Sequence, residues 1–418
     1  MSVSMTHRTI ASNILTSLVA FVGLAGCAQI VVPAGGDAAV DVHVPEASVA
    51  DVQRPDGHPD VPPIVDVPPF MTAPHEPFPE IPDQGGTRLV HPHIVVITYA
   101  DDTSRSDDED YAAWMVHSDW LTNVGREYGV TAGDIVANVR LTQNAPIMTS
   151  STTIEHVLGS GVLDGTFPQP TAGLTDTIYV VFFPSTSTIQ LTDMGTTSTS
   201  CSEFLGYHSS FRVGTAVVPY AVVATCPDVG NPTQNLQVTV SHELIEAATD
   251  LDPLGMPALQ FTLDTQSAWI ALGGEVADLC EGDDLFDGTH WAARVWSNQA
   301  VRTGSSDPCV PLDTSQPYFN VSSSPDASRA VNPGDTVVFP LVGWSTARMA
   351  DWDLALTPTG TLVAPMSLST MRMNNGRTAT VTVNVPMDAP SGSYAGILVY
   401  SMRSGTDYHV WPLLLYVQ

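Results

Sequence analysis

Residues 236–250 read LQVTVSHELIEAATD, and this stretch decides the fold that we predict around it. His242 and Glu246 are four residues apart, so on an α-helix they project from the same side. The apolar residues recur at the spacing of one helical face, which we expect to be buried. That face consists of Leu236, Val240, Leu244 and Ala247.

The pattern formed by His242, Glu243 and Glu246 predicts a zinc site. An imidazole and a carboxylate at this spacing can bind one Zn²⁺ ion. Glu243 stands where the general base of a zinc hydrolase stands in the His-Glu-x-x-His pattern. Because Glu246 replaces the second histidine, the metal would be a weaker Lewis acid. We therefore expect a zinc centre in which Glu243 is the catalytic base.

A third ligand is expected from the segment GEVADLC at residues 274–280. Glu275 follows the helix at a distance that suits a glutamate zincin. Asp278 could orient His242 from behind, or could itself be the ligand. In the hypothesised reaction the metal lowers the pKa of a water, Glu243 takes its proton, and hydroxide attacks an amide carbonyl. The alternative is a non-catalytic surface or adhesion module, in which these residues bind a structural metal or none.

Weaker candidates lie nearby. His208, in the segment GYHS, could approach the site or could be a hydrogen-bonded structural histidine, and Tyr207 could stabilise an oxyanion. An oxygen-rich cluster could hold Ca²⁺, although it lacks the spacing of an EF-hand loop and could equally be a solvated acidic loop. That cluster comprises Glu281, Asp283, Asp284 and Asp287.

The N-terminus predicts export and lipid attachment. Residues 1–12 are polar and carry Arg8, and residues 13–25 are mostly apolar but too short to span a bilayer. The sequence LAGC that ends at Cys27 resembles a bacterial lipobox, in which the cysteine is acylated. We expect a signal peptide over 1–26 and a lipid anchor on Cys27 that holds the chain to a bilayer in the cell envelope, at the outer membrane or cell surface.

Residues 27–85 are rich in proline, valine, alanine and aspartate, and show neither a helical nor a strand period. This composition predicts an extended, solvated and disordered tether. The chain as a whole carries a net charge of −30, which argues against nucleic acid as a partner. All 14 basic residues are arginine, and the absence of lysine excludes a Walker-type nucleotide loop. The expected substrate is instead a peptide or another component of the cell envelope.

Four cysteines remain after Cys27, an even number for an oxidising compartment. They allow three pairings. We favour Cys201 with Cys226 and Cys280 with Cys309, because each pair closes a short local loop. Each disulfide would stabilise the fold by about 3 kcal/mol through the entropy of the unfolded chain.

Strand and helix patterns divide the rest of the chain in two. The strands predicted at His93–Tyr99, Thr177–Phe183 and Val217–Ala224 alternate with helices at 108–128 and 153–158. They predict an α+β domain of α/β type over 86–314. Residues 315–418 predict a β-sandwich. Its expected strands include Thr336–Leu341, Thr378–Val385 and Ala395–Tyr400.

Two segments together resemble a known family. SHELIEAATD at 241–250 and EVADLCEG at 275–282 are similar to the paired signatures of the phosphate-induced protein (EXORDIUM-like) family and related bacterial secreted proteins. The resemblance covers roughly residues 90–312 and implies a secreted, disulfide-bearing domain with a zincin-like site. Residues 386–394, PMDAPSGSY, resemble the closing strands of immunoglobulin-like modules of secreted bacterial enzymes. We therefore expect a lipid-anchored zinc hydrolase, most simply a metallopeptidase, with a C-terminal immunoglobulin-like module.

Overall fold

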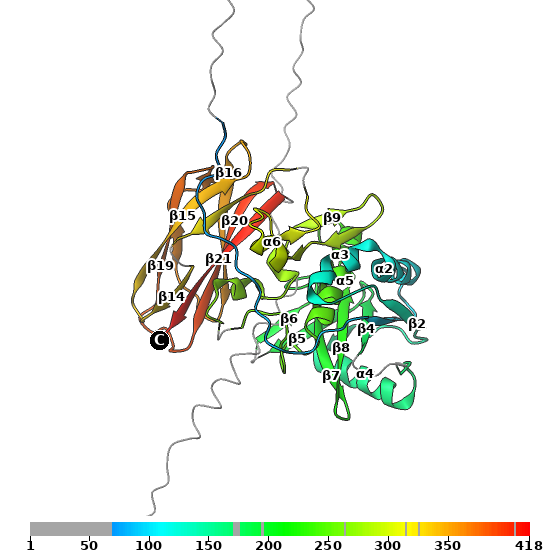
Figure 1. Ribbon diagram of the computed structural model, residues 1–418. Helices are drawn as coiled ribbons and strands as arrows, with labels where there is room; N and C mark the ends of the chain where they lie inside the picture. Colours follow the sequence, from blue (N-terminus) through cyan, green and yellow to red (C-terminus); the bar gives the residue numbers. More distant parts are fainter. Residues whose placement is uncertain are drawn as a thin grey trace, which may run out of the picture.

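The computed structural model describes residues 69–169, 176–193, 196–262, 265–313, 316–324, 327–404 and 407–418. The predicted signal peptide, Cys27 and the tether up to residue 68 lie outside the described residues. Two parts lie side by side in Figure 1, one of mixed helices and strands and one of strands. Within the described ranges, no helix has both the length and the apolar character that crossing a membrane requires.

A five-stranded sheet organises the first part, with the strand order β2-β1-β4-β8-β7. The first four of these strands are parallel to their neighbours, and β7 pairs antiparallel with β8 at one edge. The predicted central strands are confirmed, because burial on both faces produces the uninterrupted apolar runs seen in the sequence. The bounds are β1 His93–Thr98, β2 Asp134–Arg140, β4 Thr177–Phe183, β7 Gly206–Val213 and β8 Ala216–Ala224.

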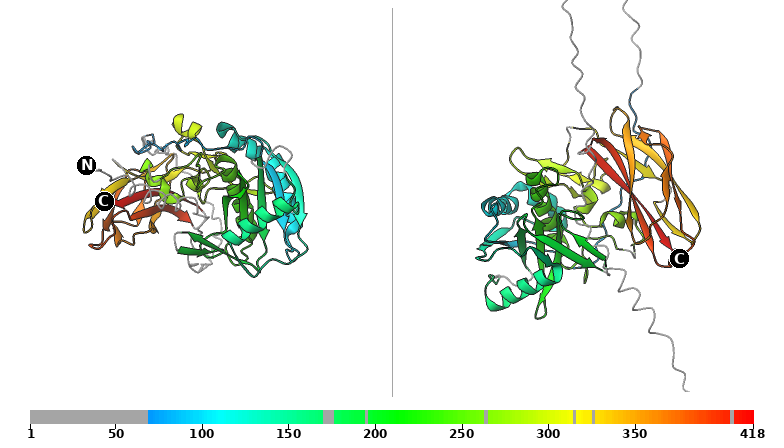
Figure 2. Two further views of the ribbon diagram at one scale, coloured as in Figure 1. Left: turned by 90° about the horizontal axis from the view of Figure 1, so that it is seen from below. Right: turned by 180° about the vertical axis from the view of Figure 1, so that it is seen from behind.

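Helices cover both faces of this sheet (Figure 2). Helices α2 (Arg105–His117), α3 (Asp119–Gly125) and α5 (Pro232–Thr249) contribute to one apolar core, and α4 (Ser151–Asp164) contributes to a second core. The helix predicted over 108–128 is therefore interrupted, since Ser118 has an extended backbone between α2 and α3. A 3₁₀ turn at Arg126–Tyr128 follows α3.

Short elements complete the first part. A small sheet orders its strands β3-β5-β6, and β9 pairs with β10 and β11 with β12. Both predicted disulfides are confirmed, Cys201–Cys226 with Cα atoms 5.4 Å apart and Cys280–Cys309 at 5.8 Å. The bounds are β3 Met148–Ser150, β5 Thr188–Asp193, β6 Thr196–Thr199, η5 Ala268–Leu272, η6 Asp278–Cys280, β9 Asp284–Phe286, β10 Trp291–Ala293, β11 Val295–Trp296, α6 Asn298–Arg302 and β12 Cys309–Val310.

The second part contains two sheets, ordered β13-β15-β19-β17 and β14-β21-β20-β16-β18. The strands predicted from the sequence correspond to β15, β19 and β20, with differences of a few residues at their ends. The bounds are β13 Phe319–Ser323, β14 Ser328–Val331, β15 Thr336–Ser345, β16 Trp352–Gly360, β17 Met366–Leu368, β18 Arg372–Met373, β19 Thr378–Asn384, β20 Tyr394–Ser404 and β21 Asp407–Val417. The chain thus combines helices with several sheets, and strand predominates over helix.

Residues 69–86 form a segment, here called the strap, that lies across both parts of the molecule (Figure 1). The prediction of a solvated tether is wrong for residues 69–85, because Phe78 and Ile81 are buried in the larger core. The backbone of Ile81 exchanges two hydrogen bonds of 2.8 Å with the Asn298 side chain. The Phe78 ring contacts aromatic rings from both parts, namely Trp269, Trp296, Tyr318, Trp344 and Trp411.

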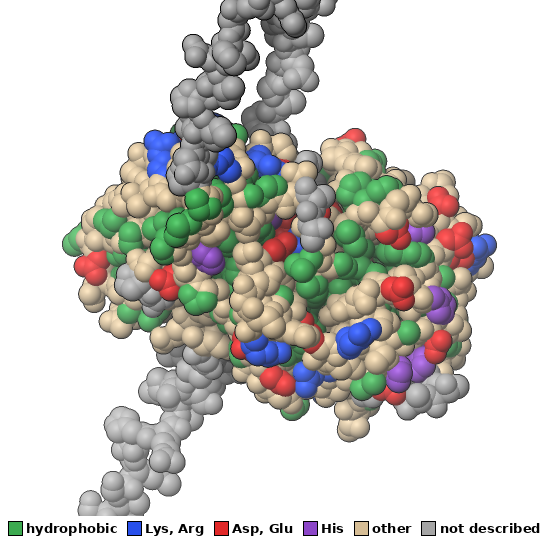
Figure 3. Space-filling view, turned by 45° about the horizontal axis from the view of Figure 1, so that its top comes forward, with side chains coloured by type: hydrophobic (Ala, Val, Ile, Leu, Met, Phe, Trp, Pro, Cys, Tyr) green, Lys and Arg blue, Asp and Glu red, His purple; other side chains and the backbone are tan. Residues whose placement is uncertain are grey.

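The face in Figure 3 shows acidic and basic side chains in small separate groups among uncharged and apolar ones. This distribution fits a chain in which charged residues make up only 14% of the sequence, so that uncharged polar residues must cover much of the surface. Other charged side chains, among them His242, Glu246 and Asp278, are buried in the interior.

Candidate metal centre

Helix α5 brings three of the predicted site residues into the core. Asn231 caps its N-terminus, because its side chain accepts a hydrogen bond from the Gln234 N–H. Pro232 is the first helical residue, where a missing N–H costs nothing. From residue 239 to 249 every position is buried, so the predicted single apolar face is only part of what the helix buries. The side chains of His242, Glu243 and Glu246 are between 2% and 4% exposed.

Strand β7 carries His208, for which the sequence allowed either a place in the site or a structural role. Side chains alternate across a strand, and Tyr207 points into the smaller core, where its ring contacts Tyr220. His208 therefore faces α5 and is 2% exposed. Gly206 allows the close approach, since a Cβ atom there would collide with Thr239 of the helix. His208 thus belongs to the site, whereas Tyr207 lies on the opposite side of the sheet and is not placed to stabilise an oxyanion there.

The segment at residues 273–280 closes the site from the other side. Gly273 has φ of +116°, and a Cβ atom at this position would collide with the Asp278 carboxylate. That carboxylate accepts a 3.1 Å hydrogen bond from the Glu275 N–H. The N–H groups of Ala277 and Asp278 each donate to Glu246 Oε1 at 3.0 Å. These bonds fix the Glu246 carboxylate through Oε1, while its other oxygen, Oε2, lies next to His242.

Three ligand atoms converge at the first subsite. His242 Nε2 lies 3.1 Å from Glu246 Oε2 and 3.3 Å from Asp278 Oδ1. Two ligands that bind one tetrahedral zinc ion at about 2.0–2.1 Å are separated by about 3.3 Å, so these distances match the edges of such a site. His242, Glu246 and Asp278 are one of the buried groups that could hold a metal ion. Asp278, and not Glu275, is therefore the carboxylate that completes this group.

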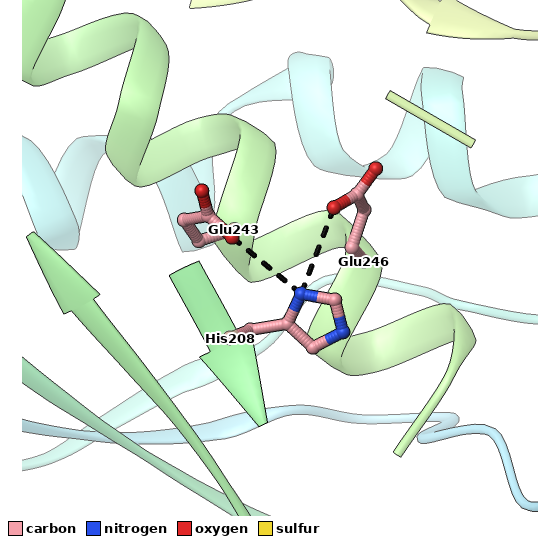
Figure 4. A group of neighbouring side chains, drawn as sticks. All are labelled: His208, Glu243 and Glu246. Atoms are coloured by element: carbon pink, nitrogen blue, oxygen red, sulfur yellow. Dashed lines mark ion pairs between the residues drawn. The ribbon is translucent and has the colours of Figure 1, made fainter. Parts of the chain in front are cut away.

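A second group shares Glu246 with the first. His208 Nδ1 lies 3.5 Å from Glu243 Oε2 and 3.6 Å from Glu246 Oε2. Dashed lines in Figure 4 mark these two contacts. The other ring nitrogen, Nε2, lies 3.3 Å from Glu275 Oε1. Glu275 is therefore in the cluster, but it faces His208 and not the first subsite. Glu243 Oε1 is buried without a hydrogen-bond partner.

The excess of buried carboxylates shifts several pKa values. Burial and the neighbouring Glu246 carboxylate raise the pKa of Asp278 to about 7 and hold the pKa of Glu275 well above its usual range. Burial opposes the charged form of His208, but the carboxylates of Glu275 and Glu243 outweigh it and raise the His208 pKa well above normal. Without a cation, the cluster compensates its negative charge by holding protons.

The calcium cluster predicted at residues 281–287 does not form, since no three of Glu281, Asp283, Asp284 and Asp287 come together as possible ligands of one ion. Asp283 lies 3.7 Å from Arg294 and 3.4 Å from His409, while Asp284 accepts a hydrogen bond from Gln234. Asp287 accepts hydrogen bonds from the backbone of its own turn. Because each of these carboxylates has a separate partner, the loop does not gather oxygen ligands around one point.

Comparison with known proteins gives no family assignment. No protein-family model matches the chain, and no curated protein matches it. Domains 4 and 5 of the S-layer protein SbsC are similar at 17% identity and a TM-score of 0.19, over 24% of this chain and 53% of that one. A GH5 xyloglucanase from Bacteroides ovatus is similar at 11% identity and a TM-score of 0.18, over 24% and 19%.

A nucleoside hydrolase-related hypothetical protein from Saccharophagus degradans is similar at 13% identity and a TM-score of 0.21, over 45% of this chain and 49% of that one. The chain spans about half, or less, of the length of each of these structures. Likenesses at this level carry no argument about function, which therefore rests on the side chains of the buried cluster.

Proposed function

We propose that this protein is a zinc-dependent hydrolase, with a metallopeptidase as its most natural form. The observation that carries the proposal is the convergence of His242 Nε2, Glu246 Oε2 and Asp278 Oδ1 at separations of 3.1 and 3.3 Å. Nitrogen and carboxylate oxygen are ligands that zinc accepts. A divalent cation also offsets negative charge that would otherwise be buried at a high cost in free energy.

Glu243 is the residue that favours catalysis over simple metal storage. It follows His242 directly on α5, yet it lies outside the first group of ligands. Its Oε1 atom is buried and has no hydrogen-bond partner, so it can accept a proton from a water molecule. A zinc ion in the first subsite would supply a water of lowered pKa beside this carboxylate. Metal-assisted amide hydrolysis uses such a pairing.

The setting that we propose is the cell envelope. A lipid on Cys27 would hold the chain to a bilayer, and the oxidising compartment would maintain the two disulfides that the structure contains. We also propose that residues 86–314 form a zincin-like domain and that residues 315–418 form an immunoglobulin-like module. The antiparallel edge strand β7, which carries His208, is where an extended peptide could add to the sheet.

A second candidate is a non-catalytic surface or adhesion protein with a structural metal. The burial of the cluster favours it, because Glu246, Glu275 and Asp278 are only between 2% and 4% exposed. Structural zinc sites are closed in this way, whereas catalytic sites keep one position open to solvent. On this view the metal would add to stability and the protein would hydrolyse nothing.

The experiment that separates the two uses the full-length chain. Bound zinc is measured by mass spectrometry, and hydrolysis is measured on a mixed peptide library. If the protein is a zinc hydrolase, zinc at the first subsite is lost in His242→Ala. In Glu243→Gln the rate of cleavage falls at least 100-fold, while zinc stays at the subsite that contains His242. Glu155→Gln, on the other face of the sheet, is the matched control. Zinc without cleavage would favour the structural candidate, and metal-free protein would refute both.

A further inference from the structure

Three carboxylates lie close to the His208 side chain, which has only two ring nitrogens to pair with them. Its Nδ1 atom lies 3.5 Å from Glu243 Oε2 and 3.6 Å from Glu246 Oε2. Both separations exceed the roughly 2.7–3.2 Å of a normal N–H···O hydrogen bond. A single N–H shared between two acceptors at such distances makes only a weak hydrogen bond with each. Distances of this size are instead close to the separation of about 3.3 Å between two ligands of one metal ion.

The far side of the same ring has the arrangement expected behind a metal ligand. His208 Nε2 lies 3.3 Å from Glu275 Oε1, and both residues are buried. Histidines that bind a metal through one nitrogen commonly donate the other N–H to a carboxylate, which fixes the ring and strengthens the ligand. His208 Nε2 and Glu275 Oε1 are both buried without a hydrogen-bond partner, so a small adjustment would let Glu275 accept that N–H and leave Nδ1 as a neutral donor for a cation.

The charge of the cluster supports the same conclusion. Five buried carboxylates lie around the two imidazoles: Glu243, Glu246, Asp250, Glu275 and Asp278. With both imidazoles neutral, one divalent ion leaves three negative charges uncompensated. Two divalent ions leave only one. Uncompensated buried charge is costly, so the cluster has the charge of a site for two ions.

We propose that a second divalent cation binds to His208 Nδ1, Glu243 Oε2 and Glu246 Oε2, so that Glu246 bridges a two-ion centre. The inference rests on the proposed function, because the first ion is the one held by His242 and Asp278. The second ion engages Glu243 and therefore competes with its role as proton acceptor. Its occupancy would lower the hydrolytic rate, as a built-in inhibition by excess metal.

The test counts bound ions on the full-length chain, dialysed against buffers of increasing free Zn²⁺ and analysed by mass spectrometry. The expected result is two zinc ions per chain at saturation and one in His208→Ala. His242→Ala should also lose one ion, and Glu246→Gln should lose both. His156→Ala, an exposed histidine on α4, is the control that keeps two.

Circular dichroism shows whether each variant folds. Glu243→Gln keeps the shape of the side chain and should also bind a single ion, which provides a second route if His208→Ala does not fold. One ion in the wild type that survives Glu243→Gln and is lost in His242→Ala would overturn the second subsite and leave the proposed function standing. No ion in the wild type would overturn both.

Discussion

Glu246 accepts a 3.0 Å hydrogen bond at Oε1 from the backbone N–H of Asp278, while its Oε2 atom lies 3.1 Å from His242. The Glu246 side chain thus connects helix α5 to a residue 32 positions further along the chain, and it is the side chain that we propose as a metal ligand. The backbone bonds fix the carboxylate in the absence of a cation, so the fold preorganises the proposed first subsite.

Replacement of Glu246 by glutamine should separate its role as acceptor of backbone hydrogen bonds from its proposed role as a metal ligand. The amide oxygen can still accept the hydrogen bonds from Ala277 and Asp278, so the free energy of unfolding without metal should change by about 1 kcal/mol or less. The NH₂ group cannot ligate zinc, so affinity should fall more than about 10-fold. Competition with a chromophoric chelator measures the affinity, and urea unfolding with chelator present measures stability. Unchanged affinity would contradict the ligand assignment.

Gly273→Ala should damage the same site through the backbone. Gly273 has φ of +116°, and an added Cβ would collide with the Asp278 carboxylate. Gly165 is the matched control, because its φ is +82° but no heavy atom lies within 4 Å of an added Cβ. Both alanine variants should lose about 1 kcal/mol to strain, and Gly273→Ala should lose about 1–3 kcal/mol more. Equal urea midpoints for the two variants would show that the collision does not matter.

Phe78→Ala should destabilise the molecule by about 3–5 kcal/mol, the cost of emptying a large buried aromatic position. Phe78 is 6% exposed and contacts rings from both parts. Met71→Ala, at a strap position that is 78% exposed, should change stability by less than about 0.5 kcal/mol. Thermal unfolding followed by tryptophan fluorescence compares the two. A similar midpoint in both variants would mean that the strap does not hold the parts together.

Asp108→Asn should stabilise the protein at alkaline pH. Burial, and after it the neighbouring Asp102, raise the pKa of Asp108 from 3.8 to about 8. The folded chain therefore keeps a proton that the unfolded chain releases, and this contribution to stability is lost as the pH rises from about 4 to about 8. Asparagine removes that loss, so the melting temperature at pH 8 should rise by about 2–4 °C for each kcal/mol regained.

The control for this change is Asp110→Asn, an exposed position on the same helix. It should leave the dependence of the melting temperature on pH unaltered. Melting curves at pH 5 and pH 8 test both variants. If Asp108→Asn loses as much stability as the wild type between these two values, the buried carboxyl is not the source of the dependence.

The parts of the fold that the sequence predicted well are those with an unambiguous local pattern. Strand β4 is buried at all seven positions, so its run of apolar residues is unbroken. Strand β2 was missed because its residues alternate between exposed and half-buried, as suits an edge strand. The strap was misread because its prolines suggested a tether, although Phe78 and Ile81 were apolar residues that a solvated tether does not need.

The candidate site was predictable where its residues share one helix. His242, Glu243 and Glu246 were identified from spacing alone, since an α-helix fixes their relative positions. The role of His208 depends on the pairing of β7 with β8, which local sequence does not specify. A signal did exist, because Tyr207, Phe211 and Val213 alternate toward the smaller core and so direct His208 to the other face.

The path of the strap has a mechanical consequence. Asn375 forms hydrogen bonds of 2.8 Å with the Ala73 N–H and 2.9 Å with the Met71 carbonyl. Within the described residues, these bonds are the first that connect the strap to the rest of the fold. If the chain hangs from a lipid on Cys27, any pull on that anchor enters the folded region here. The load would reach Asn375 before the aromatic cluster at Phe78, and only then the helix that carries the metal ligands. Under that proposal, the contacts of the strap would bear the force before it reached the candidate metal site.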